Sequence, residues 1–168
     1  MTGGIEHEVI GYSETTLELD DSFAYAGKFR VPNGKAVSRE EDSGVVAALS
    51  FSPDHADEDA VRVRYFAVRE DRRGEGIGSE LLGNASDRLL DREHAKVRIS
   101  VNNPYALEAA HKAGFGWTGD TAGLAELVMQ RPLSEVDREK RHSAALRRFA
   151  ERDLTDDEEA FVRRKLHD

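Results

Sequence analysis

The chain has 168 residues, which is enough for one core domain with an appendage. Its 33 acidic and 24 basic residues give a formal net charge of −9, which disfavours a nucleic-acid partner because phosphate binding needs a basic face. The absence of cysteine excludes disulfides, thiolate metal sites and a cysteine nucleophile.

The first half of the chain predicts mainly strands, bounded by turn residues. The strands are expected over residues 5–12, 35–39, 44–52 and 61–68. The second and third of these form a hairpin, and residues 32–34 signal a turn before it. Residues 15–31 are ambiguous, because one part alternates like a strand while Phe23, Ala26 and Phe29 could line a short helix.

The second half alternates helices and strands. Apolar residues at helical spacing predict a long helix that begins near Ile77. Next come a strand over 96–101, a helix to about Ala113 that Gly114 should stop, and a strand pair over 115–118 and 124–130 joined by residues 119–123. This order predicts an α+β fold, with a mixed, mostly antiparallel sheet of six to seven strands flanked by helices.

The composition changes at Pro132, which divides the chain into a domain over residues 1–131 and a C-terminal helical extension over 132–168. Ser134 is expected to cap a helix that ends near Glu151, and Thr155 with Glu158 forms a capping box for a second helix. The two helices either pack on the domain or form a partner-binding or dimerising appendage.

Composition also bears on location and ligands. The chain has no run of eighteen apolar residues and no basic-then-apolar start, so we expect neither a membrane partner nor a signal peptide, and a cytoplasmic protein. The six His residues lack metal-ligand spacing, and we expect no metal site. The acids are spread along the chain, which favours adaptation to high salt over attraction of cationic amines.

A glycine-rich loop joins the strand over 61–68 to the long helix. Its glycines let the backbone approach a ligand, the helix start offers unpaired N–H groups, and Arg72 and Arg73 add charge. The loop is therefore suited to a phosphate or pyrophosphate. It matches neither the dinucleotide fingerprint, which needs glycine where Ser79 stands, nor the P-loop, which needs a lysine.

Two segments together resemble the GNAT acyltransferase superfamily. The Arg-x-x-Gly-x-Gly pattern of Arg73, Gly76 and Gly78 follows a strand that ends in Phe-Ala-Val, as in the acyl-CoA pyrophosphate loop of that family. Downstream, Asn103, Ala106 and the pair Gly114-Phe115 match the family's segment after its fifth strand. The resemblance covers roughly residues 35–131.

The resemblance implies acetyl-CoA as co-substrate, held in a V-shaped gap between the fourth and fifth strands. The implied cofactor-binding residues are Phe66, Ala67, Val68, Arg73, Gly74, Glu75, Gly76, Ile77, Gly78, Ser79 and Asn103. Asn103 also fits the N-cap of the helix that starts at Pro104.

The sequence departs from the family at one catalytic position. Ala110 stands where the family often has a tyrosine that protonates the departing thiolate. His111 and Tyr105 are the candidate catalytic replacements, although His111 also fits an ordinary half-exposed helix residue.

The implied function is an N-acetyltransferase. It would transfer the acetyl group of acetyl-CoA to a primary amine of a small molecule or protein, by direct attack in a ternary complex, since no cysteine can form an acyl-enzyme. The alternative is a non-catalytic acyl-CoA-binding regulatory module that acts through a partner protein, because Ala110 and the C-terminal helices are otherwise unexplained. The sequence determines neither the acceptor nor the general base nor the oligomeric state, for which a homodimer is one option.

Overall fold

Tertiary contacts divide the chain into two units, residues 1–97 and 98–168. The computed structural model describes residues 4–92, 94–123 and 125–167. Seven strands and four α-helices lie in these described residues, so the predicted α+β class and strand number are confirmed.

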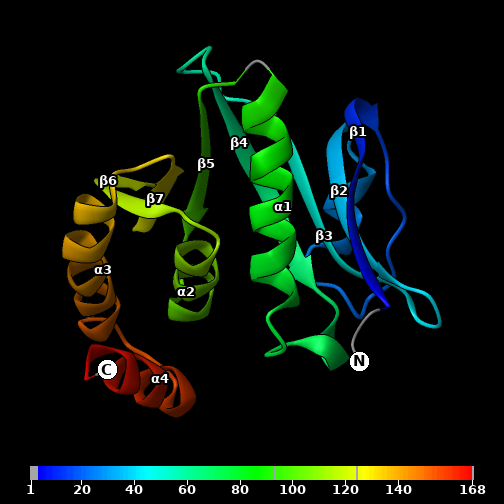
Figure 1. Ribbon diagram of the computed structural model, residues 1–168. Helices are drawn as coiled ribbons and strands as arrows, with labels where there is room; N and C mark the ends of the chain where they lie inside the picture. The colour runs from blue at the N-terminus through cyan, green and yellow to red at the C-terminus, as the bar shows by residue number, and fades with distance from the viewer. Residues whose placement is uncertain (1–3, 93, 124, 168) are drawn as a thin grey trace. The chain divides into compact units, whose positions relative to one another are not determined.

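The first unit contains four strands that pair antiparallel in chain order (Figure 1). They are β1 (Ile5–Thr15), β2 (Asn33–Glu40), β3 (Gly44–Pro53) and β4 (Ala60–Val68). The predicted hairpin is present, because Glu40 of β2 pairs with Gly44 of β3. The register places Val37 opposite Ala48 and Ala48 opposite Ala67, so these three side chains line one face of the unit.

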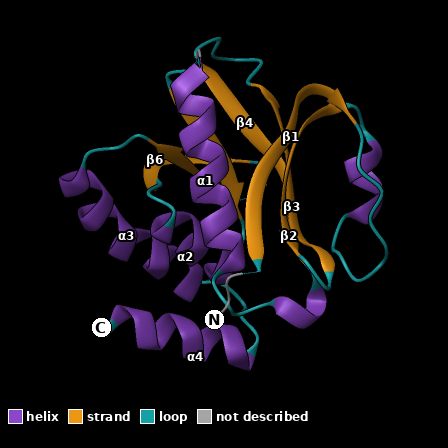
Figure 2. Ribbon diagram, turned by 45° about the vertical axis from the view of Figure 1, so that its right-hand side comes forward, coloured by secondary structure: helices purple, strands orange, loops and turns teal. Residues whose placement is uncertain are grey.

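The two faces of these four strands are covered by different elements (Figure 2). Helix α1 (Ile77–Arg92) packs on one face and contacts all four strands. Its buried apolar side chains are Ile77, Leu81, Leu82, Ala85 and Leu89. On the other face, Phe23 and Phe29 pack against the cluster of Val37, Ala48 and Ala67. The ambiguous segment therefore forms irregular chain with one short 3₁₀ helix, η1 (Ala26–Arg30).

A buried lysine closes the turn before β2. The side chain of Lys35 is fully buried, and its Nζ donates to the Val31 carbonyl at 2.7 Å and to Asn33 Oδ1. Burial lowers the pKa of this amine. These bonds hold the start of β2, which begins at Asn33, inside the segment predicted as a turn.

The second unit is built around strands β5 (Lys96–Val101), β6 (Gly116–Ala122) and β7 (Glu126–Arg131). In this group β7 lies between β5 and β6, and it pairs antiparallel with β6. Helix α2 (Pro104–Lys112) lies between β5 and β6 in the chain, and Gly114 stands just beyond its end, as predicted. Gly114 has φ of +99° and donates to the His111 carbonyl, while Phe115 donates to the Ala110 carbonyl, which is the Schellman pattern.

The predicted C-terminal end of the first strand in the last pair was wrong. The expected loop over residues 119–123 is mostly strand, because β6 continues to Ala122. Gly119, with φ of +94°, lies in a register shift between Trp117 and Thr121 and so makes a bulge rather than a turn. Leu124, the predicted first residue of the last strand, lies outside the described residues.

The C-terminal helices α3 (Glu135–Ala150) and α4 (Asp156–Leu166) pack within the second unit. Ser134 and Thr155 cap them as predicted, and the Thr155–Glu158 capping box is complete. Helix α3 lies so close to β6 that a Cβ on Gly116 would meet Arg138 Cγ at 2.7 Å. This packing agrees with the first of the two alternatives for the extension, while the boundary between residues 131 and 132 stays a prediction.

None of the described helices has the length and apolar character needed to cross a membrane. In the same residues, no group of three or more His, Asp and Glu side chains could hold a metal ion.

The contact between Gly34 and Phe51 yields a stability test. A Cβ at Gly34 would fall inside the Phe51 ring, which is 2% exposed, so Gly34→Ala should cost about 1–3 kcal/mol of unfolding free energy. Gly27→Ala is the matched control, because no atom lies within 4 Å of its added Cβ. Urea unfolding midpoints measure both variants, and equal midpoints would contradict the assigned packing.

Candidate functional site

The loop between β4 and α1 exposes bare backbone. A short 3₁₀ helix, η2 (Glu70–Arg72), follows β4, and α1 begins five residues later. Gly74 and Gly76 have φ of +82° and +83°, and a Cβ at either position would meet nothing within 4 Å. Glycine is therefore needed at both positions for backbone conformation rather than for space, and no side chain shields the loop there.

Gly78 has a different role, because it allows the first turn of α1 to touch β4. A Cβ at Gly78 would lie 3.0 Å from Phe66 Cζ and from Val68 Cγ2. Phe66 and Val68 thus face α1, while Ala67 faces the cluster on the other side of the strands. The helix start is held directly against the last residues of β4.

Unpaired N–H groups converge at this helix start. Among the described residues, the N–H groups of Glu75 and Gly76 have no hydrogen-bond acceptor. The next N–H groups, from Ile77 to Ser79, open the helix, where intrahelical acceptors are missing. The helix dipole adds partial positive charge at the same place. The arrangement suits an anion such as a pyrophosphate.

The two predicted arginines differ in their partners. Arg72 donates to both carboxylate oxygens of Glu40, at 2.6 and 3.0 Å, and also contacts Glu75 at 3.2 Å. The hydrogen bonds that Arg72 donates to Glu40 and Glu75 raise the pKa of Arg72, and those to Glu40 lower the pKa of that carboxyl. Arg73 is exposed and makes no ion pair within the described chain; its Nε lies 3.4 Å from the Val68 carbonyl. Arg73 is thus the loop cation left for a ligand.

Asn103 lies in the second unit and caps α2. Its Oδ1 accepts the Ala106 N–H at 2.8 Å, and Pro104 follows at the first helical position. The N-cap interpretation is therefore confirmed. The Nδ2 group lies 3.5 Å from Asn102 Oδ1, too far for a strong bond, and it stays a candidate donor to a ligand.

His111 is packed against α3 instead of being half free on the helix. Its ring stacks on that of His142, with centroids 3.7 Å apart and an interplanar angle of 11°. Burial, followed by the charges of His142 and Arg138, lowers the pKa of His111 to about 4. His111 is therefore neutral at pH 7, and its buried Nδ1 has no partner among the described residues. An imidazolium acid at this position is disfavoured.

Tyr105 and Ala110 lie on the same helix as His111 but differ in exposure. Ala110 is fully buried, whereas Tyr105 is 44% exposed. The Tyr105 ring lies 4.7 Å from the Phe161 ring of α4. Burial raises the pKa of Tyr105, and the carboxylates of Asp157 and Glu158 add to the effect, so the phenol stays protonated at neutral pH.

Two charged pairs, one in each unit, were not predicted from the sequence. Glu40 pairs with Arg72 across 32 positions, and Glu108 pairs with His142 at 3.2 Å across 34 positions. His142 lowers the pKa of Glu108 to about 2, with Lys165 assisting. Both pairs join distant segments, so local periodicity carries no signal for them. Glu40 is a weak base while Arg72 holds it, because the hydrogen bonds from Arg72 lower its pKa.

The stacked histidines predict a pH dependence of stability. The pKa of His111 is about 4 in the folded state against an ordinary 6.5. The stability that the folded protein gains from keeping His111 neutral is therefore fully present above pH 6.5 and is lost as the pH falls toward 4. The stabilisation from Glu108, whose pKa falls from 4.5 to about 2 on folding, is fully present above pH 4.5 and is lost only below it, which separates the two effects. His111→Gln should therefore flatten the loss of stability between pH 6.5 and 4.5 in urea unfolding. His167→Gln, at an exposed position, is the control, and equal slopes in both variants would contradict the assignment.

Solved structures share this fold, while no curated protein matches the chain. The protein yncA of Salmonella typhimurium, solved with its cofactor acetyl-CoA, has a TM-score of 0.52 and 21% identity over 61% of this chain and 65% of its own. A phosphinothricin acetyltransferase of Sinorhizobium meliloti, in complex with acetyl-CoA, has a TM-score of 0.52 and 21% identity, and the match covers 61% of this chain and 62% of its own. The ribosomal-protein-alanine N-acetyltransferase of Brucella melitensis has a TM-score of 0.51 and 20% identity, and the match covers 60% of this chain and 68% of its own. The chain thus spans about two thirds of these proteins, and such identities show a shared fold alone.

A match to a family model shows family membership, which the similarity to these structures does not. The model described as the acetyltransferase (GNAT) family matches residues 5–115, more than half of the 168 residues. The matched range contains the glycine loop, Asn103 and the Gly114-Phe115 pair, and it ends before α3 and α4. The chain belongs to the acetyltransferase (GNAT) family.

Proposed function

We propose that the protein is an acetyl-CoA-dependent N-acetyltransferase that acts on a primary amine of a small molecule or protein. The observation that carries the proposal is the β4–α1 loop, where bare glycine backbone, unpaired N–H groups and one uncommitted arginine meet. Membership of the GNAT family and the acetyl-CoA bound to two structures of this fold support it.

In this proposal the loop holds the pyrophosphate of acetyl-CoA. The N–H groups from Glu75 to Ser79 donate to the phosphate oxygens, and Arg73 supplies the full positive charge. Gly74 and Gly76 leave the backbone accessible to the phosphates. The backbone of Phe66–Val68, at the end of β4, accepts the pantetheine arm, because the side chains of Phe66 and Val68 are already occupied by contact with α1.

The chemistry is direct aminolysis of a thioester. The amine nitrogen attacks the carbonyl carbon, the carbon–sulfur bond breaks, and its electron pair leaves with the CoA thiolate. One proton leaves the nitrogen, and one proton is taken up by the sulfur. Of the two sequence candidates for the second transfer we favour Tyr105, since its hydroxyl is protonated and partly exposed whereas His111 is neutral and stacked.

The primary amine that accepts the acetyl group can belong to a small molecule or to a protein. Among structures of this fold, one is named for phosphinothricin and another for a ribosomal-protein alanine.

A glycine substitution tests cofactor binding. Acetyl-CoA should raise the melting temperature of the wild-type protein by mass action, and Gly76→Val should abolish that rise, because valine strains the φ of +83° and covers the loop. Gly119→Val is the matched control, with φ of +94° and open space around its Cβ. It should lower stability similarly but keep the response to acetyl-CoA. A wild-type protein that shows no response would sink the proposal.

Thiol release with a panel of primary amines tests turnover. Tyr105→Phe should lower kcat by about 10²-fold or more if Tyr105 protonates the thiolate, whereas His111→Gln should lower it less than about tenfold. The reverse order would move the role to His111. Saturable acetyl-CoA binding without thiol release for any amine would replace the transferase with the non-catalytic regulatory module.

A further inference from the structure

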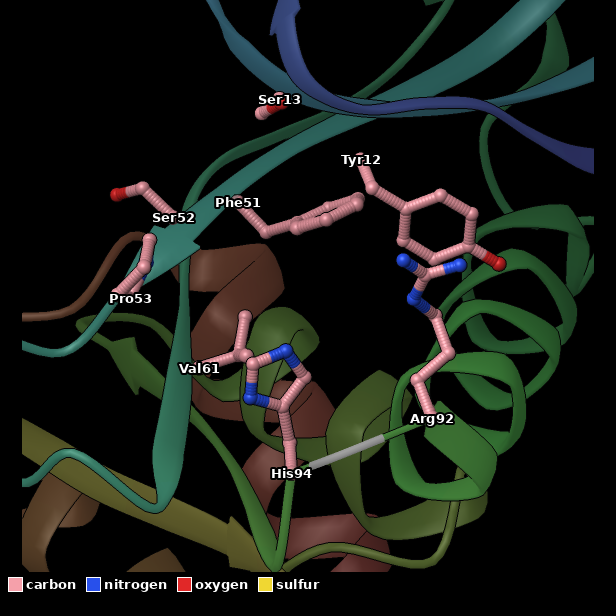
Figure 3. A pocket seen from close by; sticks show the side chains of 8 residues that line it. All are labelled: Tyr12, Ser13, Phe51, Ser52, Pro53, Val61, Arg92 and His94. Atoms are coloured by element: carbon pink, nitrogen blue, oxygen red, sulfur yellow. The ribbon is translucent and has the colours of Figure 1, made fainter.

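We propose that a cavity at the C-terminal end of α1 binds a small carboxylate with a planar apolar body. The cavity has a volume of about 210 Å³ and lies wholly in the first unit (Figure 3). The ends of β1 and β3, the first residues of β4 and the last turn of α1 surround it. Its volume suits a ligand the size of one substituted ring rather than a nucleotide.

This cavity is separate from the pyrophosphate loop. The loop meets the first turn of α1, at Ile77, while the cavity meets the last residue, Arg92. A helix rises 1.5 Å per residue, so the 16 residues of α1 place the two sites about 24 Å apart. One ligand of the proposed size cannot occupy both.

Arg92 supplies the anion-binding group. Its guanidinium carbon lies 3.8 Å from the centroid of the Tyr12 ring, so the flat face of the cation is stacked. Stacking leaves the N–H groups along the edge of the guanidinium free, and this edge matches a carboxylate with two parallel hydrogen bonds. In the described part of the chain Arg92 makes no ion pair, although acids outnumber bases 33 to 24.

An arginine at a helix C-terminus is often explained by the helix dipole alone. Here the guanidinium leans over Tyr12 and faces the cavity, as Figure 3 shows, and no described carbonyl accepts a hydrogen bond from it. The dipole therefore accounts for a cation at this place but not for its stacked orientation.

The remaining walls suit the body of the ligand. Phe51 lies edge-on to Tyr12, with centroids 6.2 Å apart and an interplanar angle of 69°, and its ring packs directly against Gly34. Val61 adds an aliphatic surface. Across the cavity from Arg92, the His94 imidazole points inward and offers a second polar contact (Figure 3).

Polar selectivity rests on Arg92 and His94. Ser52 also borders the cavity, but its Oγ accepts a hydrogen bond from Arg64 Nε at 2.7 Å. Figure 3 shows the Ser52 side chain directed away from the cavity. With one guanidinium stacked on Tyr12 and a second aromatic ring from Phe51, a monoanion with a ring fits better than a polyphosphate or a cation.

Benzoate is the probe for this site. Calorimetric titration of the wild-type protein should show saturable benzoate binding, with half-saturation on the order of 1 mM for so small a ligand, and none with benzylamine. Arg92→Lys keeps the charge but loses the planar fork, and it should weaken benzoate binding at least about fivefold. Arg88→Lys, one turn earlier on the exposed side of α1, is the matched control and should bind like wild type.

The site is tested independently of the proposed function. Arg92→Lys should respond to acetyl-CoA as wild type does, and benzoate and acetyl-CoA should raise the melting temperature additively. Benzoate heat that grows linearly without saturation would overturn the proposal. So would equal benzoate affinity in Arg92→Lys and wild type, or equal binding of benzylamine and benzoate.

Discussion

The contact between Gly78 and the end of β4 is the constraint on which the loop depends. A Cβ on Gly78 would lie only 3.0 Å from side-chain atoms of Phe66 and Val68, so the absence of a side chain lets α1 start this close to β4. That close start fixes where the first N–H groups of the helix point, and it forces the chain from Arg73 to Gly76 into a tight path with two positive φ angles. The anion site is thus a product of packing, and the glycines serve it in two distinct ways.

Charge in the loop is divided between structure and ligand. Glu40 and Glu75 neutralise Arg72 and bind the loop to the end of β2, while Arg69 donates to the Ser43 carbonyl in the β2–β3 turn and pairs with Asp71. The loop therefore holds its shape through contacts with its own unit. A ligand that meets an already ordered loop loses less binding free energy to conformational entropy, which is the benefit of preorganisation.

Local chemistry made much of this predictable from the sequence. Capping residues, apolar spacing and Gly114 predicted α1 to α4 closely, because each signal lies within one or two turns of the element that it bounds. The loop was recognisable for the same reason. The pairing of Arg72 with Glu40, and of His111 and Glu108 with His142, was not, since these partners lie more than 30 residues away and depend on packing. Gly119 was misjudged because positive φ serves turns and bulges alike.

Arg138 shows how α3 completes an element that precedes it. The side chain donates to the carbonyl of His111 at 2.7 Å and to that of Phe115 at 3.3 Å, at the end of α2. A residue more than twenty positions downstream thus supplies the positive group that a helix C-terminus needs. The range matched by the family model ends at residue 115, before α3, so the arginine at the end of α2 comes from sequence beyond the matched range. Grafting residues 5–115 alone onto another chain would keep the Gly114–Phe115 cap of α2 but lose the two hydrogen bonds that Arg138 donates there.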